Sequence, residues 1–382
     1  MKKTIYYWSP CLTNVGTIKS TLNSSIALAR YNSNYEVILL NVFGEWSDCK
    51  RYLNNNGVKV KDLTFNYNNF LPKYGFIKSR ISYILISFIS LLPLLILLKK
   101  KKPDYIIAHL ITSLPLILFN FFRFDTKLIL RISGYPQLNY YRKKLWYFSS
   151  KNIFKVTCPT LDLLEELKQK NIFNEKKLSL LSDAIINIQD FKKKINDINF
   201  IPKIDLPKNF FLSVGRFTRQ KNYFYLVNEF KTICEKYPDI KLLIIGDGEL
   251  RKKVEIFIQN LNLEKNIFVI SYTKNVFHYM KKATAFILSS LWEEVGFVIV
   301  EAAMSNTTVI SSDCKNGPKE FLSNGGGGYL FENNKQNALV KSFELFLNES
   351  ESNIYHKKVK AKKNCLKFTM FRHQIELNKI LK

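Results

Sequence analysis

Short apolar runs alternate with longer helix-type patterns along almost the whole chain, and no repeat of 20–50 residues interrupts them. This alternation is typical of parallel α/β layers, and the missing repeat excludes a solenoid. The strands expected in the first half are Thr4–Trp8, Glu36–Val42, Tyr105–His109, Lys127–Ile132 and Lys155–Cys158. Those expected in the second half are Asn209–Val214, Lys241–Ile245, Ile267–Ser271, Ala285–Ser289 and Thr308–Ser311. The expected helices are Ser20–Arg30, Thr160–Lys170, Tyr223–Tyr237, Glu249–Leu261, Val276–Lys282 and Gly296–Ser305.

The length of the chain predicts two domains, because 382 residues exceed the usual ~100–200 residues of one domain. Asn196–Lys208 contains Pro202 and Pro207 with little periodicity, which favours a linker there. We therefore expect an α/β chain with two Rossmann-like doubly wound domains, residues 1–200 and 201–363. Such domains face one another across a cleft, and parallel sheets bind ligands at the carboxyl ends of their strands.

The formal net charge is +27, and the first 200 residues hold 30 Lys and Arg against 13 Asp and Glu. A basic balance suits an anionic membrane surface, nucleic acid or polyanionic ligands, but no nucleic-acid-binding pattern accompanies it. The six cysteines are scattered without a CxxC pair, which argues against zinc and against disulfides and favours a reducing cytoplasm. The chain starts with a strand-like run, so no secretory signal is expected.

Ile81–Leu98 contains no charged residue and is followed by Lys99–Lys102. Three interpretations are open: a buried helix of the first domain, a membrane span of threshold length, and a helix that lies in the surface of a membrane. In the third, the lysines meet anionic head groups. The apolar stretch Leu110–Phe124 adds to that possibility.

A basic turn follows the expected strand that ends at Val214. Gly215 allows a sharp turn and a close approach to a ligand, while Arg216 and Lys221 place two cations near the start of the next helix. Free amides at a helix start also favour anions, so this turn suits a diphosphate. The alternative is an ordinary solvated turn.

A second turn, Gly246–Arg251, follows the next strand with the sequence Gly-Asp-Gly-Glu-Leu-Arg. The third glycine of a dinucleotide-binding fingerprint is replaced here by Arg251. We therefore expect a tight strand-to-helix turn and no dehydrogenase.

Two glutamates follow the strand that ends near Ser289. Glu293 lies in the loop, Glu301 lies eight residues later at a helix start, and Gly296 between them frees the loop amides for a ligand. Carboxylates accept hydrogen bonds from sugar hydroxyls, so this pair could hold the two sugars of one nucleotide sugar. The alternative is an acidic loop beside a surface helix.

Together these motifs closely resemble the donor half of the family 4 retaining glycosyltransferases, which have the GT-B fold. The resemblance covers about residues 209–345 and includes a final segment with Asp313 and Gly317-Pro-Lys-Glu320. It implies that Arg216 and Lys221 neutralise the donor diphosphate after the Gly215 turn and that Glu301 binds the ribose. It also implies that Glu293 contacts the transferred sugar. The amides of Gly296, Phe297 and Val298 would then lie beside the phosphates.

The first half resembles the family less. Thr13–Gly16 takes the place of a loop that faces the donor phosphates, with Gly16 as its one glycine, and His109 takes the place of a cleft-facing catalytic histidine. Arg131–Gly134 ends a strand on the acceptor side. The resemblance further implies that residues 364–382 form a helix that crosses back onto the first domain.

The resemblance implies a hexosyltransferase that retains the anomeric configuration, uses a UDP- or GDP-sugar, and needs no cofactor or tightly bound metal. The expected acceptor is a lipid-linked glycan of a bacterial lipopolysaccharide or capsule, reached from the cytoplasmic face of the plasma membrane. Glu294-Val295 departs from the family's Gly-Phe beside the donor sugar. Two alternatives remain: a sugar-nucleotide epimerase of similar fold, and a non-enzymatic basic protein that binds membrane surfaces.

Overall fold

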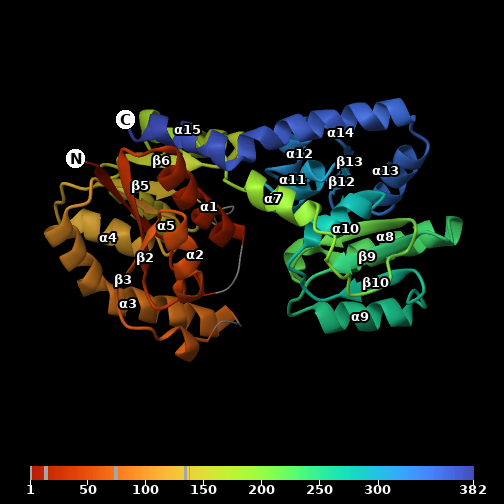
Figure 1. Ribbon diagram of the computed structural model, residues 1–382, viewed down its shortest axis with the longest axis horizontal. Helices are drawn as coiled ribbons and strands as arrows, with labels where there is room; N and C mark the ends of the chain where they lie inside the picture. Colours follow the sequence, from red (N-terminus) through yellow and green to blue (C-terminus); the bar gives the residue numbers. More distant parts are fainter. Residues whose placement is uncertain (1, 13–15, 73–75, 133–135, 137) are drawn as a thin grey trace. The chain divides into compact units, whose positions relative to one another are not determined.

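The structure is a computed structural model that describes residues 2–12, 16–72, 76–132, 136 and 138–382. The chain forms two compact units, residues 1–185 with 369–382, and residues 186–368 (Figure 1). Each unit contains one parallel sheet with helices on both faces. The expectation of two Rossmann-like doubly wound domains is therefore confirmed.

The first unit contains a seven-stranded sheet in the order β3-β2-β1-β4-β5-β6-β7, in which all the paired strands are parallel. Its first strand lies inside the sheet, so the strand order reverses between β1 and β4. The strands are β1 Lys3–Trp8, β2 Tyr35–Asn41, β3 Lys59–Asp62, β4 Tyr105–Ala108, β5 Lys127–Arg131, β6 Lys155–Cys158 and β7 Leu178–Leu180.

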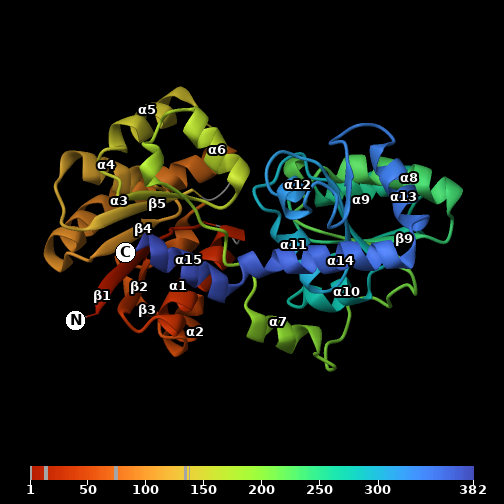
Figure 2. The same cartoon turned by 90° about the horizontal axis from the view of Figure 1, so that it is seen from above.

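Both faces of this sheet are buried, because successive side chains of a strand point to opposite faces. Ile5 and Tyr7 pack with α1, α2 and α15, while Tyr6 and Trp8 pack with α3, α4, α5 and α6. Figure 2 shows α15 beside α1. The helices are α1 Gly16–Tyr31, α2 Lys50–Asn55, α3 Phe76–Lys101, α4 Ser113–Phe121, α5 Tyr140–Ser149, α6 Leu161–Gln169 and α15 Met370–Ile380.

The second unit repeats this plan with a six-stranded parallel sheet in the order β10-β9-β8-β11-β12-β13. Its strand order reverses between β8 and β11. The strands are β8 Phe210–Val214, β9 Lys241–Ile245, β10 Ile267–Ile270, β11 Ala285–Leu288, β12 Thr308–Ser312 and β13 Tyr329–Phe331. The helices are α7 Ile188–Ile195, α8 Tyr223–Lys236, α9 Arg251–Asn260, α10 Val276–Lys282, α11 Phe297–Met304, α12 Pro318–Phe321, α13 Ala338–Leu347 and α14 Glu351–Cys365.

The second unit begins earlier than the expected residue 201 because α7 packs on it. The Phe191 and Phe277 rings lie 5.1 Å apart, and Asn275 Nδ2 donates to Lys194 O at 2.7 Å. The segment expected as a linker also packs on this unit, since Lys203 N donates to Tyr279 Oη at 3.0 Å. At the other end α14 stays with the second unit, and α15 alone joins the first.

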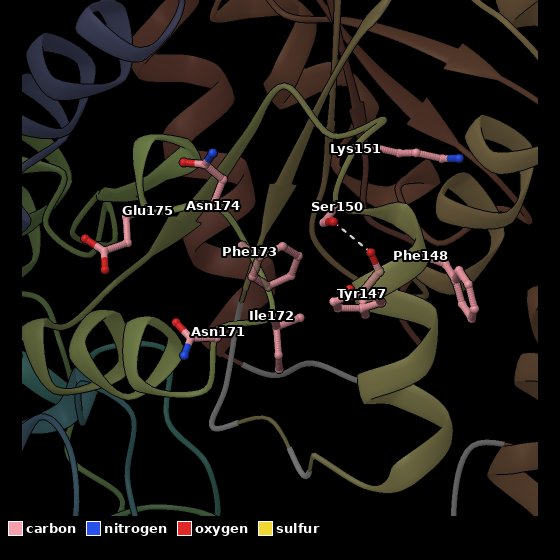
Figure 3. Close-up of a pocket in the computed structure, with 9 residues that line it drawn as sticks. All are labelled: Tyr147, Phe148, Ser150, Lys151, Asn171, Ile172, Phe173, Asn174 and Glu175. Carbon is pink, nitrogen blue, oxygen red and sulfur yellow. Dashed lines mark hydrogen bonds between the residues drawn. The ribbon is translucent and has the colours of Figure 1, made fainter.

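A pocket of about 490 Å³ lies at the amino ends of β6 and β7 (Figure 3). It is lined by Tyr147, Phe148, Ser150, Lys151, Asn171, Ile172, Phe173, Asn174 and Glu175. His109 follows the carboxyl end of β4 and therefore lies at the opposite edge of the sheet. The pocket contains none of the residues that the sequence singled out.

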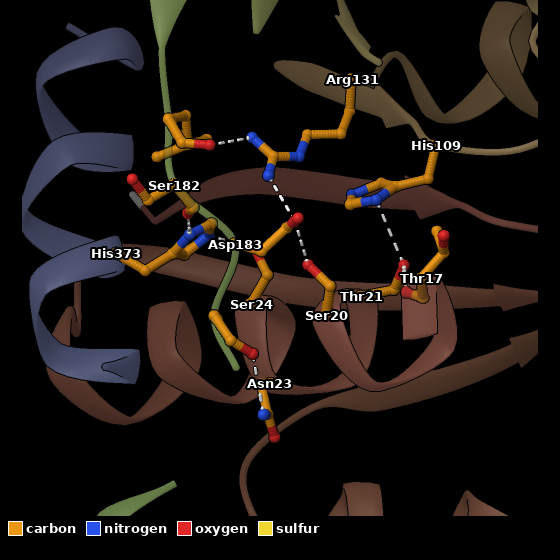
Figure 4. A network of polar contacts seen from close by, with 12 residues as sticks. Thr17, Ser20, Thr21, Asn23, Ser24, His109, Arg131, Ser182, Asp183 and His373 are labelled. Carbon is orange, nitrogen blue, oxygen red and sulfur yellow. Dashed lines mark hydrogen bonds and ion pairs between the residues drawn. The ribbon is translucent and has the colours of Figure 1, made fainter. Parts of the chain in front are cut away.

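A buried polar network ties β5 to α1 and to the segment after β7 (Figure 4). The Arg131 guanidinium pairs with Asp183, and the two side chains are 1% and 5% exposed. Arg131 also donates to Leu181 O, and Ser20 Oγ donates to Asp183. The structure thus buries the Arg131 side chain inside the first unit, where its two terminal nitrogens bond Asp183 and Leu181 O, whereas the sequence suggested that it could line the acceptor side.

We expect Asp183→Ala to lower the free energy of unfolding of the first unit by about 3–5 kcal/mol, since it leaves a buried guanidinium unpaired. Glu36→Ala, which removes the exposed pair with Lys59, should cost less than about 1 kcal/mol. Both variants are compared by urea unfolding in a Trp292→Phe background. The remaining tryptophans, Trp8, Trp46 and Trp146, all lie in the first unit, so their fluorescence reports the unfolding of that unit. Equal costs for the two variants would contradict the structural role of the pair.

His373 anchors α15 in a buried, neutral form. Its Nδ1 donates to Ser182 O at 2.6 Å and its Nε2 lies 2.7 Å from Ser24 Oγ. Burial, with Arg131 nearby, lowers the pKa of His373 to about 4.

Stability should therefore depend on pH below the ordinary histidine pKa of about 6.5. Between these two pKa values His373 is protonated in the unfolded chain but not in the folded chain. Its contribution to the free energy of unfolding is therefore complete above pH 6.5. It should decline as the pH falls from about 6.5 to about 4. The loss due to His373 itself is about 3 kcal/mol. It is measured by urea unfolding in the Trp292→Phe background as the difference between chains with His373 and with His373→Gln, because His109 and Glu45 also titrate in this unit. His373→Gln should flatten this slope, and an unchanged slope would contradict the assignment.

Candidate functional site

The residues with candidate chemistry lie at the carboxyl ends of central strands, where the order of each sheet reverses. In the second unit the loop after β8 carries Gly215–Lys221 and the loop after β11 carries Ser289–Gly296. Parallel sheets bind ligands outside the carboxyl ends of their strands at such a reversal. The structure brings the predicted basic turn and Glu293 together at this edge.

Two glycines let the turns after β8 and β9 meet backbone to backbone. A Cβ on Gly246 would lie 1.9 Å from Gly215 O, and one on Gly248 would lie 2.6 Å from Phe217 O. Phe217 N donates to Asp247 O at 3.0 Å, which joins the turns further. The Gly-Asp-Gly motif is thus a tight strand-to-helix turn, as its sequence predicted.

Lys221 folds back over Gly215, because a single 3₁₀ turn, Arg219–Lys221, ends at Asn222 with φ +54°. A Cβ on Gly215 would lie 3.0 Å from Lys221 Cε and 3.0 Å from Tyr223 Oη. The absence of a side chain at position 215 therefore leaves the space that the Lys221 side chain occupies.

Lys221 and Glu293 form a buried ion pair, with side chains 14% and 8% exposed. Ser290 Oγ donates to the same Glu293 carboxylate at 2.7 Å, and Ser289 Oγ donates to Lys221 O at 2.8 Å. Burial raises the pKa of the neighbouring Tyr223. A hydrogen bond with Ser213 lowers this pKa by a smaller amount, and the negative charge of Glu293 raises it. The sequence assigned Lys221 and Glu293 to different parts of a ligand, but the structure holds them in direct contact.

The basic turn and the acidic loop are also joined through their backbones. Leu291 N donates to Gln220 O at 2.8 Å, and Gln220 Nε2 donates to Trp292 O at 2.8 Å. Arg216, one residue after Gly215, has an exposed side chain at this edge.

Gly296 starts α11 with φ +74°, a conformation that favours glycine. The amides of Phe297 and Val298 belong to the first turn, which has no carbonyl partners within the helix. Glu301 is the fifth of the eight residues of α11, in the middle of the helix and not at its start as expected, and its side chain is buried.

Gly317 brings the last predicted motif against this loop. With φ +66°, a Cβ on it would lie 2.3 Å from Glu294 O and 2.7 Å from Val295 Cα. Glu320 pairs with Lys367 at 3.2 Å, and Asp313 accepts from Asn333 N at 2.8 Å. The motif therefore supports the loop that departs from the family pattern at Glu294-Val295.

In the first unit, His109 follows β4 and is buried. Its Nδ1 lies 3.2 Å from Thr21 Oγ1, and its Nε2 contacts no hydrogen-bond partner in the described part of the chain. Burial lowers the pKa of His109 well below its ordinary value, with smaller effects from Arg131 and His373. Gly16 begins α1 at the same edge, whereas Thr13–Val15 and Ser133–Gly134 lie outside the described residues.

The sequence did not single out Ser290 or Thr21, which hydrogen-bond Glu293 and His109. A serine after a strand and a threonine within a helix are too common to signal such roles. Within the described ranges no group of three or more His, Cys, Asp and Glu side chains has the arrangement of a metal site.

The chain is similar to known glycosyltransferases. Residues 194–364 match the family model described as glycosyl transferases group 1. An uncharacterized glycosyltransferase of Methanocaldococcus jannaschii is 32% identical over 242 residues, which are 59% of this chain and 59% of that protein. A Campylobacter jejuni protein is 26% identical over 234 residues, covering 59% of this chain and 62% of its own length. It is named N-acetylgalactosamine-N,N'-diacetylbacillosaminyl-diphospho-undecaprenol 4-alpha-N-acetylgalactosaminyltransferase.

The chain thus spans about three fifths of the length of these two curated relatives. The crystal structure of a Rickettsia africae glycosyltransferase superposes with a TM-score of 0.71 at 16% identity, covering 100% of this chain and 98% of that one. This likeness extends the shared GT-B fold to both units. The second unit, which carries the ordered motifs, is therefore similar to the group 1 glycosyl transferases over residues 194–364.

Proposed function

We propose that this chain is a retaining hexosyltransferase that moves a sugar from a nucleoside diphosphate sugar to a lipid-linked glycan. The observation that carries the proposal is the buried Lys221–Glu293 pair at the strand-order reversal of the second sheet. The retaining stereochemistry rests on the resemblance of the ordered motifs to the family 4 enzymes.

Lys221 supplies a desolvated cation whose position is set from two sides. Glu293 holds its ammonium group and Gly215 accommodates its stem. A fixed cation acts strongly on charge that develops in a transition state, because little reorganisation is needed at the moment of reaction. We assign Lys221, with the exposed Arg216, to the diphosphate that departs from the sugar.

The start of α11 adds neutral donors to these cations. The amides of Phe297 and Val298 lie in its first turn, and helix starts favour phosphate groups. With Arg216 and Lys221 neutralising the diphosphate, the proposed reaction needs no tightly bound metal ion. The donor is a UDP- or GDP-sugar.

Glu301 and Glu293 are assigned to the sugars of the donor. Glu301 is buried four residues into α11 beyond Phe297, and we assign its carboxylate to the ribose hydroxyls. Glu293, which shares its carboxylate with Lys221 and Ser290, is assigned to the transferred hexose. In the first unit, His109 is neutral and contacts Thr21 of α1, the helix that Gly16 begins. We assign His109 a catalytic role and Gly16 a place beside the donor.

The proposed step exchanges one bond at the anomeric carbon. The bond from that carbon to the diphosphate oxygen breaks and its electron pair leaves with the nucleoside diphosphate. An acceptor hydroxyl oxygen bonds to the same carbon with retention, and its proton leaves with the diphosphate or to water. The Campylobacter relative is named for a diphospho-undecaprenol acceptor, which supports a lipid-linked acceptor here. We place the chain as a peripheral protein on the cytoplasmic face of the membrane.

We expect Lys221→Ala to lower kcat by about 10²–10³-fold in an assay of nucleoside diphosphate release from a panel of UDP- and GDP-sugars. Lys231→Ala, an exposed lysine on α8, is the matched control and should leave turnover unchanged. A chelator should also leave the wild-type rate unchanged.

A double variant separates catalysis from folding. Lys221→Ala leaves Glu293 buried without its partner, whereas Lys221→Met with Glu293→Gln removes both charges. Recovery of turnover in the double variant would mean that the lysine only neutralised Glu293, and the proposal would fail.

Glu301→Gln should raise the donor KM about 10–100-fold with a smaller change in kcat, because ribose contacts form before the transition state. The same variant should weaken binding of the free nucleoside diphosphate in calorimetry, which needs no acceptor. Glu332→Gln, an exposed carboxylate of the same unit, is the control. Unchanged binding in Glu301→Gln would sink the ribose assignment.

A further inference from the structure

Helix α3 is apolar on two sides, and only one side contacts the protein. Ile86, Leu94, Leu97 and Leu98 belong to the core of the first unit, and Ser82 and Ser90 are fully buried between them. The opposite side is exposed, with Phe88 78% accessible. Such a large exposed apolar side is rare on soluble proteins and marks an interaction surface.

The exposed side continues onto α4, which contacts α3 in the same helical layer. Phe121 at the end of α4 is 79% exposed. We call this surface the α3–α4 face and define it by Ile84, Phe88, Leu91, Leu92, Phe121 and Phe122. On the next helix, α5, the exposed Tyr140, Tyr141 and Tyr147 add amphipathic rings of the kind that favour a membrane interface.

The charge around this face is strongly positive. Residues 76–151 contain 13 Lys and Arg, two Asp and no Glu. Lys99–Lys101 form the last turn of α3 and Lys102 follows it. Lys99 Nζ lies 4.9 Å from the centre of the Phe122 ring, and α5 carries Arg142–Lys144. Each basic residue near an anionic bilayer contributes to binding through the negative surface potential.

Part of α3, Ser79–Lys101, is long and apolar enough to cross a bilayer, and 33% of its central window is buried. A span would have to remove its core side from the sheet. It would also break the hydrogen bond from Ser82 Oγ to Pro72 O, which measures 2.8 Å. A helix that keeps this packing can offer lipid only its outer side.

We propose that the α3–α4 face docks in the plane of an anionic lipid bilayer, with Lys99–Lys102 at the head groups. The apolar side chains enter the boundary between head groups and acyl chains, as those of in-plane amphipathic helices do. This inference deepens the proposed function, because a lipid-linked acceptor resides at that surface.

The test is sedimentation of the full chain with vesicles of phosphatidylglycerol and phosphatidylcholine, compared with phosphatidylcholine alone. The triple variant Phe88→Gln, Leu92→Gln, Phe121→Gln should lower the partition coefficient at least about tenfold. Lys100→Glu with Lys101→Glu should lower it at least about tenfold on anionic vesicles only. Raising the salt from about 0.1 M to about 1 M should weaken wild-type binding, because the Debye length falls from about 10 Å to about 3 Å.

Matched controls exist on the second unit. The first control is a triple variant that removes three other exposed apolar side chains, Ile198→Gln, Ile201→Gln and Leu366→Gln. The second control makes the same charge change on α9, with Lys252→Glu and Lys253→Glu. Both should bind vesicles as the wild type does. Circular dichroism and nucleoside diphosphate binding by calorimetry should be unchanged in all four variants, which separates this proposal from the proposed function.

Three results would overturn the proposal. Indifference of the wild type to lipid charge would remove the anionic surface as the partner. Resistance of the membrane-bound chain to alkaline carbonate extraction would indicate a span. A dimer in light scattering that the triple variant dissociates, without vesicle binding by the wild type, would identify a second copy of this chain as the occupant.

Discussion

The reversal of strand order in each parallel sheet is the constraint on which both candidate sites depend. The first strand of each unit, β1 or β8, lies inside its sheet, so the chain winds outward on both sides of it. Parallel sheets bind ligands outside the carboxyl ends of their strands at such a reversal. In the second unit the loops at the reversal carry Lys221 and Glu293, and in the first they lead to Gly16 and His109. The topology of each sheet thus determines which loops carry the candidate site residues.

Two buried ion pairs show how differently such pairs can be used. Arg131 and Asp183 are buried and pair with each other, and Leu181 O and Ser20 Oγ add one hydrogen bond to each of them. Lys221 and Glu293 lie at the loop edge, where the contact is supported by Ser290 alone among side chains of the described residues. Burying an ion pair seldom adds net stability, because desolvation offsets the attraction. The Lys221–Glu293 pair, at the carboxyl edge of the sheet, is the one that the proposed function uses.

Local pattern predicted those elements whose burial is visible in sequence. The predicted bounds of Lys155–Cys158, Lys241–Ile245 and Val276–Lys282 agree with those of the structure. The edge strand Lys59–Asp62 escaped prediction, since three of its four residues are charged and pairing with β2 alone makes it a strand. The unit boundary at 185 also escaped, because Phe191 packing on Phe277 is a contact between segments distant in sequence. The pairing of Lys221 with Glu293 is of the same kind.

Helix α3 shows why apolarity summed along a segment cannot tell a core helix from a membrane helix. The sum combines the apolar residues of all sides of the helix. A core helix and a membrane helix differ instead in which of those sides the rest of the protein covers. Here one side belongs to the core of the first unit and the other is exposed, which is the side that the proposed bilayer would cover. As a crossover helix, α3 starts at the carboxyl edge of the sheet and ends at the amino edge, before β4. A bilayer along its outer side would therefore extend to the edge where His109 lies, and a lipid-linked acceptor would reach that edge without leaving the lipid surface.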